Sequence, residues 1–449
     1  MVGTLLTTAL LLNGAVAFPQ IAEMVAKQKR QGVGIPEEVI PFPEWPGTPN
    51  HATFNQFNAA QQLVSVSGDH EFRMPGPNDI RGPCAGLNAA ANHGYIPRDG
   101  IATAETINTG LWEAFSLDKT ATLFLQTATM FFNGDPISGK WSIGPSSPKT
   151  NSLGAVGNLL GNATGICAYG HLRSEGDASI TRGDWLAPSM ASNCISYPVF
   201  LQELFDVADE MADGMITPRV LAKHSSNRKK YSIANNPNYY SPPYAGVAFT
   251  FGAHMFAFQL IANHSAAEPR GFLTKEVFMD FFGYTRDGAG NLQYTFGAER
   301  IPENWYKRSE QDPWTLADIT TSTAQQCATY PGNCQVGGNT GTVNSFKGVD
   351  LSDITGGFIN SVEDFQDPNQ LGCFISQMIQ ADTPSALSNV FNGVLLKQAT
   401  DAIQSRLIPA LAGLGNCPNV PQGKGQGEYD APFPGANGAA SGPRGVFGR

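Results

Sequence analysis

The sequence predicts a predominantly helical fold. Apolar residues recur at the three- and four-residue spacing of helices in several segments, whereas alternating strand patterns are few and no internal repeat is present. The 449 residues are 41% hydrophobic and only 15% charged, so the chain can bury a large core. The segments with helical spacing are 111–132, 197–213, 244–260, 274–282 and 386–411.

Charge and hydropathy restrict the partners of the chain. Its formal charge is −10, and no basic cluster is long enough to follow a phosphate backbone, so we expect no nucleic-acid partner. Beyond the first residues, no apolar run reaches the length of about 18 residues that a membrane span needs. The sequence leaves the oligomeric state open.

The N-terminal residues resemble an export signal. An apolar run over residues 4–17 ends in Ala15-Val16-Ala17, the small-x-small pattern that signal peptidase cleaves, which predicts a signal peptide at 1–17 and a secreted, extracellular protein. The pair Lys29-Arg30 is explained either by removal of a propeptide at 18–30 or by a solvated charge cluster. Glycosylation sequons at Asn162 and Asn263 agree with export.

The main domain is predicted at 31–417, and it begins with an irregular segment. Residues 31–80 are rich in proline, glycine and asparagine, which predicts an irregular arm over the surface. Residues 418–449 contain few large apolar side chains, which predicts a disordered tail.

Cys84 stands where a helix is predicted to begin. Pro83 precedes a short run, Ala85 to Asn92, that tolerates helix, and Gly94 closes it. The free amides of the first turn and the helix dipole favour a thiolate at this position. Such a thiolate is a nucleophile or a metal ligand, whereas the structural alternative is a half-cystine.

The cysteine count favours a functional role for Cys84. Seven cysteines are an odd number for an oxidising compartment, and setting Cys84 aside leaves six. Cys327 and Cys334 flank a turn and form a plausible local bridge, while the other pairings cannot be deduced. The remaining cysteines are Cys167, Cys194, Cys373 and Cys417.

A second informative stretch spans residues 174–184. It places Glu175, Asp177 and Asp184 beside hydroxyl side chains and glycines. The carboxylates and hydroxyls are hard oxygen donors, and the glycines make the backbone flexible. Such donors suit Mg²⁺. An exposed loop with a helix cap explains the same residues equally well.

The segment 244–260 predicts a helix with two aromatic faces. His254 shares one face with Val247, Phe251 and Phe258, whereas the other face carries Phe249, Ala253 and Phe256.

Taken together, these motifs resemble those of the fungal haem-thiolate peroxidases, the chloroperoxidase and unspecific peroxygenase family, in its long Glu-Gly-Asp branch. The resemblance spans roughly residues 60–260. It rests on Arg81-Gly82-Pro83-Cys84, Gly86-Leu87-Asn88, Ala91-Asn92-His93-Gly94-Tyr95, Pro97-Arg98-Asp99-Gly100, Glu175-Gly176-Asp177-Ala178-Ser179, Thr181-Arg182-Gly183-Asp184 and Asn236-Pro237-Asn238.

The resemblance implies an all-α fold in which helices pack around a haem b in one domain. Cys84 would be the thiolate ligand of the haem iron, pushing electron density that favours cleavage of the peroxide O–O bond. Glu175 and the backbone carbonyls of Gly176 and Ser179 would hold Mg²⁺ beside a haem propionate.

Two positions depart from the family pattern. The second proline of Pro-Cys-Pro is Ala85 here, a change that we expect haem ligation to tolerate. The family's distal glutamate and its supporting arginine fall on Ala253 and Gly246, and neither residue can transfer a proton. The adjacent His254 is the candidate catalytic acid–base, and its structural alternative is a hydrogen-bonded core histidine.

Three functions follow from these residues. The first is a secreted peroxidase or peroxygenase that uses H₂O₂ to oxidise or oxygenate apolar substrates in a channel of Phe249, Phe251, Phe256 and Phe258. The second is a haem-binding biosynthetic tailoring enzyme without general peroxygenase activity, because the distal glutamate and arginine are absent. The third is a secreted helical protein without enzymatic activity.

Overall fold

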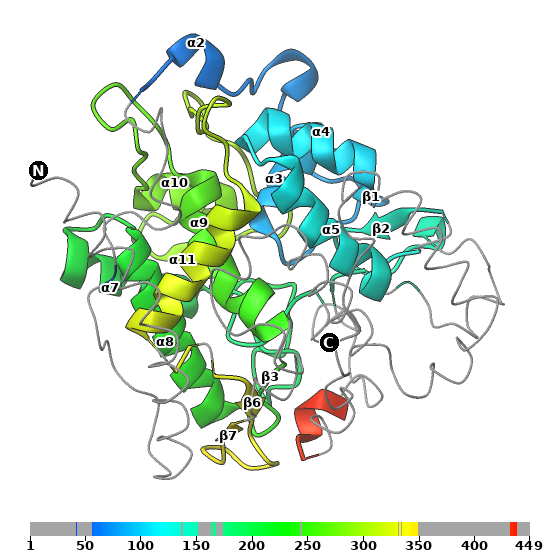
Figure 1. Ribbon diagram of the computed structural model, residues 1–449, viewed down its shortest axis with the longest axis vertical. Helices are drawn as coiled ribbons and strands as arrows, with labels where there is room; N and C mark the ends of the chain where they lie inside the picture. Colours follow the sequence, from blue (N-terminus) through cyan, green and yellow to red (C-terminus); the bar gives the residue numbers. More distant parts are fainter. Residues whose placement is uncertain are drawn as a thin grey trace, which may run out of the picture.

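The described part of the chain is mostly helical with a few small sheets, as Figure 1 shows. The computed structural model describes residues 42, 56–135, 138–150, 163, 165–167, 174–242, 245–330, 332–333, 335–348 and 432–437. The predicted signal peptide and propeptide and the helix expected at 386–411 lie outside these residues.

The helices follow the predicted segments closely in three places. The cysteine helix α3 spans Ala85–Asn92, α7 spans Pro198–Ala212 and α10 spans Lys275–Phe282. The segment 244–260 forms a π-helix, η5 (Gly246–Phe251), that continues as α9 (Gly252–Ile261). Short helical turns are α2 (Ala59–Gln62), η1 (Gly68–His70), η2 (Pro148–Thr150) and η9 (Pro434–Asn437).

The single helix predicted at 111–132 is wrong, because two helices occupy this region. Helix α4 spans Ala104–Phe115, and α5 spans Lys119–Asn133. Ser116 ends α4 in the left-handed conformation with φ +53°. The side chain of Asp118 then caps α5 by accepting a hydrogen bond from the Ala121 amide. Apolar periodicity alone did not reveal this cap.

Two further helices carry too weak an apolar pattern for sequence-based prediction. Helix α8 spans Pro218–Asn235 and buries charged residues, among them Arg228 and Lys229, so it has no clean apolar stripe. Helix α11 spans Leu316–Thr329 and begins at a capping box formed by Thr315 and Asp318.

Three small antiparallel sheets connect these helices in the described residues. Strand β1 (Ile101–Thr103) pairs with β2 (Lys140–Ser142) in the register Ile101↔Ser142. The other sheets consist of β3 (Tyr240–Ser241), β6 (Gly337–Gly338) and β7 (Lys347–Gly348), and of β4 (Tyr284–Arg286) with β5 (Leu292–Tyr294).

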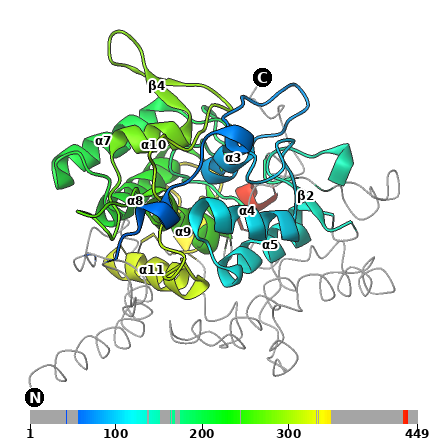
Figure 2. The same cartoon turned by 90° about the horizontal axis from the view of Figure 1, so that it is seen from above.

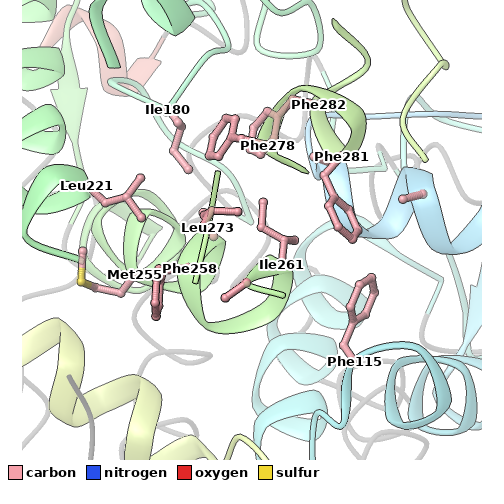
Figure 3. Packing of buried hydrophobic residues seen from close by; sticks show 14 of the residues in the cluster. Phe115, Ile180, Leu221, Met255, Phe258, Ile261, Leu273, Phe278, Phe281 and Phe282 are labelled. Carbon is pink, nitrogen blue, oxygen red and sulfur yellow. The ribbon is translucent and has the colours of Figure 1, made fainter. Parts of the chain in front are cut away.

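Helix α9 is central to the packing. It contacts α8, α10 and α11, and Figure 2 shows it between the α4–α5 pair and the group formed by α7, α8 and α10. Phe258 and Ile261 of α9 belong to the main hydrophobic cluster, as do the stacked rings of Phe278 and Phe282, whose centroids are 4.1 Å apart (Figure 3). Within the described residues, no helix is long and apolar enough to cross a membrane.

The predicted terminal regions are partly ordered. Residues 56–80 of the predicted arm include α2 and η1. Residues 432–437 of the predicted disordered tail form an ordered turn, in which Phe433 is buried and stacks on Tyr240 with ring centroids 5.0 Å apart. These six residues form a turn rather than a disordered segment, and Phe433 and Gly435 both pack against the region of Asn238 and Tyr240.

Candidate active site

A large apolar cavity lies between the helices. The space open to the centre of a water molecule is about 220 Å³. Its walls come from α3, α4, α5, η5, α9 and the segment 174–182, so residues far apart in the sequence meet there. Among the sequence-predicted site residues, the cavity brings together Cys84, Glu175, Gly176 and Ser179, and its walls also include Phe249, Ala253 and Phe256.

Cys84 is the N-cap residue of α3, and its thiol opens onto this cavity. The cysteine forms no disulfide. Its backbone is extended, with φ −81° and ψ 107°, and the helix begins at Ala85. The predicted end of this helix is also confirmed, since Gly94 follows the C-cap residue with φ +71°. The structural alternative, Cys84 as a half-cystine, is wrong.

The thiol of Cys84 has a raised pKa in the chain without cofactor. Burial is the largest cause, and it outweighs the backbone amides of Leu87 and Gly86 and the charge of Arg182, all of which lower the pKa. The predicted helix-terminus effect is therefore present, and in the chain without cofactor the effect of burial on the pKa is larger. A bound metal ion reverses this balance, because coordination deprotonates a thiol.

The loop before Cys84 is fixed by the side chain of Asn88. Its Oδ1 accepts a hydrogen bond from the Gly82 amide at 2.9 Å, and its Nδ2 donates to the Gly82 carbonyl at 2.8 Å. A Cβ atom at position 82 would lie 1.8 Å from the carbonyl oxygen of Ile143, so only glycine fits. The loop is thus held by Asn88 of α3 on one side and packs closely against Ile143, which follows β2, on the other.

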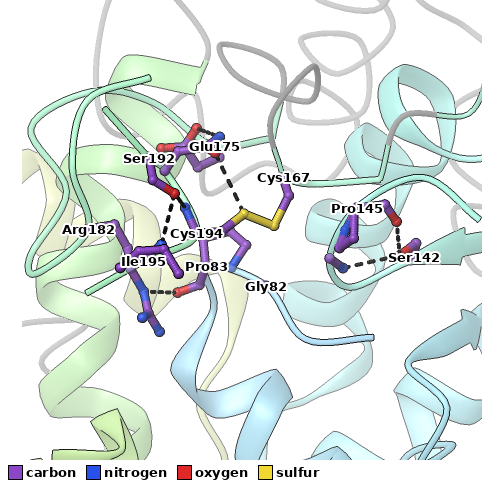
Figure 4. Close-up of a disulfide and its surroundings, with 12 residues drawn as sticks. Gly82, Pro83, Ser142, Pro145, Cys167, Glu175, Arg182, Ser192, Cys194 and Ile195 are labelled. Atoms are coloured by element: carbon purple, nitrogen blue, oxygen red, sulfur yellow. Dashed lines mark hydrogen bonds between the residues drawn. A yellow bond between two sulfur atoms is a disulfide. The ribbon is translucent and has the colours of Figure 1, made fainter. Parts of the chain in front are cut away.

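A buried ion pair supports the same loop. The guanidinium of Arg182 donates to the Pro83 carbonyl at 3.0 Å (Figure 4) and pairs with Glu299 at 3.1 Å. Glu299 also accepts a hydrogen bond from Asn88 at 3.0 Å. Burial alone would lower the pKa of Arg182, but Tyr294 and Glu299 outweigh it and the pKa is raised. Sequence reasoning missed Glu299 and Tyr294, which lie more than 110 residues beyond Arg182 and carry no local motif.

Glu175 lies at the cavity wall and is held by Asn193, whose side-chain amide donates to Glu175 Oε2 at 2.7 Å. The next residue, Cys194, forms a disulfide with Cys167 that holds this region together, as Figure 4 shows. A Cβ atom at Gly176 would lie 2.6 Å from Thr250 Oγ1, so the backbone here approaches η5 closely. The predicted bridge between Cys327 and Cys334 lies outside the described side chains.

The acidic residues of the segment 174–184 separate into two groups. Asp184 accepts from the Ala178 amide at 2.9 Å and Asp177 accepts from the Tyr240 amide at 3.2 Å, so both shape the loop and neither lines the cavity. The Ser179 carbonyl accepts from Arg228 Nε at 2.9 Å. In the described residues, no group of three or more histidine, cysteine or acidic side chains forms a metal site.

The two faces predicted for the segment 244–260 are confirmed in η5 and α9. Phe249, Ala253 and Phe256 line the cavity. Phe251 and Phe258 are buried on the other side and do not line it, so the predicted channel of four phenylalanines contains only two of them. The π-helix fits an extra residue into this wall at the cavity.

His254 lies behind the cavity wall. It is fully buried, is absent from the cavity lining, and its Nδ1 donates to the Thr250 carbonyl at 3.0 Å. Its ring centroid is 5.6 Å from that of His224. Burial, followed by the charge of His224, holds the pKa of His254 well below its usual value. The geometry matches a hydrogen-bonded core histidine, the alternative to a catalytic role.

Comparison with known proteins agrees with this arrangement. The family described as "Peroxidase, family 2" matches residues 70–310. The dothistromin biosynthesis peroxidase dotB of Dothistroma septosporum is 34% identical over 91% of this chain and 92% of its own length.

Two further relatives are named as an aromatic peroxidase and an aromatic peroxygenase. The aromatic peroxidase fscJ of Fusarium equiseti is 34% identical over 80% of this chain and 82% of its own length. An aromatic peroxygenase of Cyclocybe aegerita is 30% identical over 50% of this chain and 57% of its own length. The free cysteine at the cavity wall, the family match over more than half of the chain and the full-length similarity to dotB lead to one conclusion: the chain belongs to peroxidase family 2, the haem-thiolate chloroperoxidase and aromatic peroxygenase family.

Proposed function

We propose that the protein uses H₂O₂ to oxidise or oxygenate an apolar aromatic small molecule in the cavity beside Cys84. The observation that carries this proposal is the free thiol of Cys84 at the wall of a large apolar cavity. Membership of a peroxidase family supports it and makes the chain an oxidoreductase. The non-enzymatic alternative is therefore wrong.

The cavity residues fit a haem b. Cys84 supplies the soft sulfur donor of a thiolate ligand, and apolar side chains such as Leu87 and Phe249 supply walls for a flat macrocycle. When bound, the haem supplies the chemistry that cleaves the peroxide O–O bond. The chain's own contribution is to hold the sulfur in place through Asn88 and Arg182, and to exclude bulk water from the reacting molecules.

We retain Mg²⁺ beside Glu175 as part of the proposal. Glu175 would supply a carboxylate, and Gly176 and Ser179 would supply carbonyls. The Ser179 carbonyl already accepts from Arg228, so Glu175 must contribute most of the affinity. Metal analysis of the purified protein tests this: Glu175→Gln should lose the one Mg²⁺ that the wild type retains. A wild type without Mg²⁺ would remove the ion from the proposal.

The small number of proton-transferring groups at the cavity favours a second candidate function, a tailoring enzyme. Peroxide activation needs a group that accepts and returns a proton. Glu175 is the only carboxylate among the described residues that line the cavity, and His254 lies outside it. This observation favours a tailoring enzyme for one class of substrate over a general peroxygenase. The relative dotB, which is named a biosynthesis peroxidase, also favours a tailoring enzyme.

One set of measurements separates these functions. The purified chain is loaded with haem, and the ferrous CO complex is recorded to detect thiolate ligation. Peroxide-dependent product formation is then assayed on a broad panel of phenols and arenes. Turnover across the panel supports a general enzyme, and turnover of a narrow set supports a tailoring enzyme. A haem-loaded protein without any peroxide turnover would overturn both.

We also propose that the mature protein is secreted. The predicted signal peptide at 1–17 supports this, and so does the disulfide between Cys167 and Cys194, since disulfides persist in oxidising compartments. Expression in a secreting fungal host, followed by N-terminal sequencing of the medium fraction, tests it. Protein retained in the cell with its first residues intact would contradict secretion.

A further inference from the structure

Four buried polar atoms on side chains that line the cavity have no hydrogen-bond partner among the described residues. Each belongs to a lining side chain that is at most 4% exposed. Such atoms are costly, since a buried polar group that loses its partner destabilises a protein by about 1–3 kcal/mol. The four are Gln126 Oε1, Trp141 Nε1, Thr181 Oγ1 and Thr250 Oγ1.

Only one of these atoms specifically demands a donor. The two threonine hydroxyls can donate or accept, and the indole nitrogen only donates. Gln126 Oε1 only accepts, so a group that satisfies it must bring an N–H or O–H. Gln126 Oε1 and Trp141 Nε1 therefore each require one kind of partner, and Gln126 is the residue that requires a donor.

The amide of Gln126 is held in one orientation. Its Nε2 donates to Asn108 Oδ1 at 2.8 Å, and the hydroxyl of Thr122 donates to the same Oδ1 at 2.7 Å. The Thr122 hydroxyl also lies 3.1 Å from the Asp118 carbonyl. With Nε2 directed at Asn108, the other atom of the Gln126 amide is the oxygen. Gln126 lines the cavity from α5, and its Oε1 is buried without a hydrogen-bond partner among the described residues, on a side chain that is only 1% exposed.

We propose that Gln126 is a specificity-determining residue that accepts a hydrogen bond from the hydroxyl group of an aromatic substrate. Lining phenylalanines such as Phe115, Phe249 and Phe256 favour an aromatic ring, and Gln126 Oε1 favours a hydroxyl on that ring. The substrate class is thus a phenol or naphthol rather than a bare hydrocarbon. This inference rests on the proposed function and narrows it.

Binding without peroxide tests the inference. Calorimetry on the haem-loaded protein compares 1-naphthol with 1-methylnaphthalene, which places a methyl group where the hydroxyl stands. We expect wild type to bind the naphthol about tenfold more tightly, equivalent to about 1.4 kcal/mol. In Gln126→Met, which keeps the length of the side chain and removes the acceptor, this ratio should fall to about one.

Thr129→Val is the matched control. Thr129 lies on the same helix and also lines the cavity, but its hydroxyl donates to the Leu125 carbonyl at 2.9 Å. The control should therefore keep the wild-type ratio. Circular dichroism checks that both variants are folded, and Gln126→Leu replaces the methionine variant if the latter is not.

Two results would overturn the inference: equal affinities for the two ligands in wild type, or a tenfold ratio that survives removal of the acceptor. Neither depends on peroxide chemistry. A protein with the expected ratio and no turnover would contradict the proposed function alone, whereas turnover without the ratio would contradict only the role of Gln126.

Discussion

The two sides of the cavity are built in opposite ways. On the cysteine side, polar side chains hold the backbone: Asn88 binds Gly82, and the pair of Arg182 and Glu299 holds the Pro83 carbonyl. On the other wall, η5 and α9 present phenylalanine and alanine, and few polar atoms reach the cavity. Hydrogen bonds and an ion pair hold the cysteine side, whereas apolar packing forms the opposite wall.

This difference shows which properties of the enzyme each side controls. Directed bonds fix the position of Cys84, so changes there should alter haem ligation and stability. An apolar wall discriminates weakly, since one methylene contributes only about 1–3 kcal/mol, so the isolated polar atoms in it should control substrate choice. Removing a group from each side in turn tests the contrast.

The largest effect is expected from Cys84→Ala. This change removes the sulfur donor while the rest of the cavity stays intact. The thiolate signature of the ferrous CO complex should disappear. Peroxide-dependent turnover should fall by more than about 100-fold, since loss of a residue that only hydrogen-bonds to a metal ligand already costs about 10–100-fold. Unchanged turnover in the folded variant would mean that another residue supports the reaction.

The next effect is expected from Arg182→Met. The change leaves Glu299 fully buried without its cation, so the free energy of unfolding should fall by about 3–5 kcal/mol. Urea denaturation measures this loss. The double variant Arg182→Met, Glu299→Leu should recover a large part of it, because the uncompensated charge is gone. A loss below about 1 kcal/mol in the single variant would contradict a supporting role for the pair.

The contrast between the two sides also explains what could be predicted from the sequence. The motif around Cys84 and the Glu175 segment identified the cysteine side, because local turns and caps leave a local pattern. Glu299 could not be found, since it reaches the loop from a distant segment and its partners are set only by the fold.

For the apolar wall, the sequence predicted only which residues share a helix face. Helical spacing placed Phe249, Ala253 and Phe256 on one face and His254 on another, and the structure confirms both. It could not show which face meets the cavity, because both faces are apolar. Gln126 was missed for a related reason: a lone glutamine in an apolar helix has no motif, and its orientation depends on Asn108.

The smallest effect on activity is expected from His254→Gln. Because His254 does not line the cavity, turnover should stay within about twofold of wild type, and the effect should appear in stability instead. Burial holds the pKa of His254 well below its ordinary value of 6.5, so the folded protein keeps this ring neutral while the unfolded chain protonates it below about pH 6.5. Protons then favour unfolding, and stability falls as the pH falls.

Denaturation at pH 7.0, 6.0 and 5.0 measures this dependence. One extra proton on the unfolded chain corresponds to about 1.4 kcal/mol per pH unit, so the slope for wild type should exceed that for His254→Gln by up to this amount between pH 6 and 5. His264, whose pKa burial lowers to about 4, contributes equally to both proteins and cancels in the comparison. Equal slopes of the unfolding free energy against pH would refute a neutral buried His254. A tenfold loss of turnover in the variant would instead show that this histidine takes part in the reaction, although it lies behind the apolar wall.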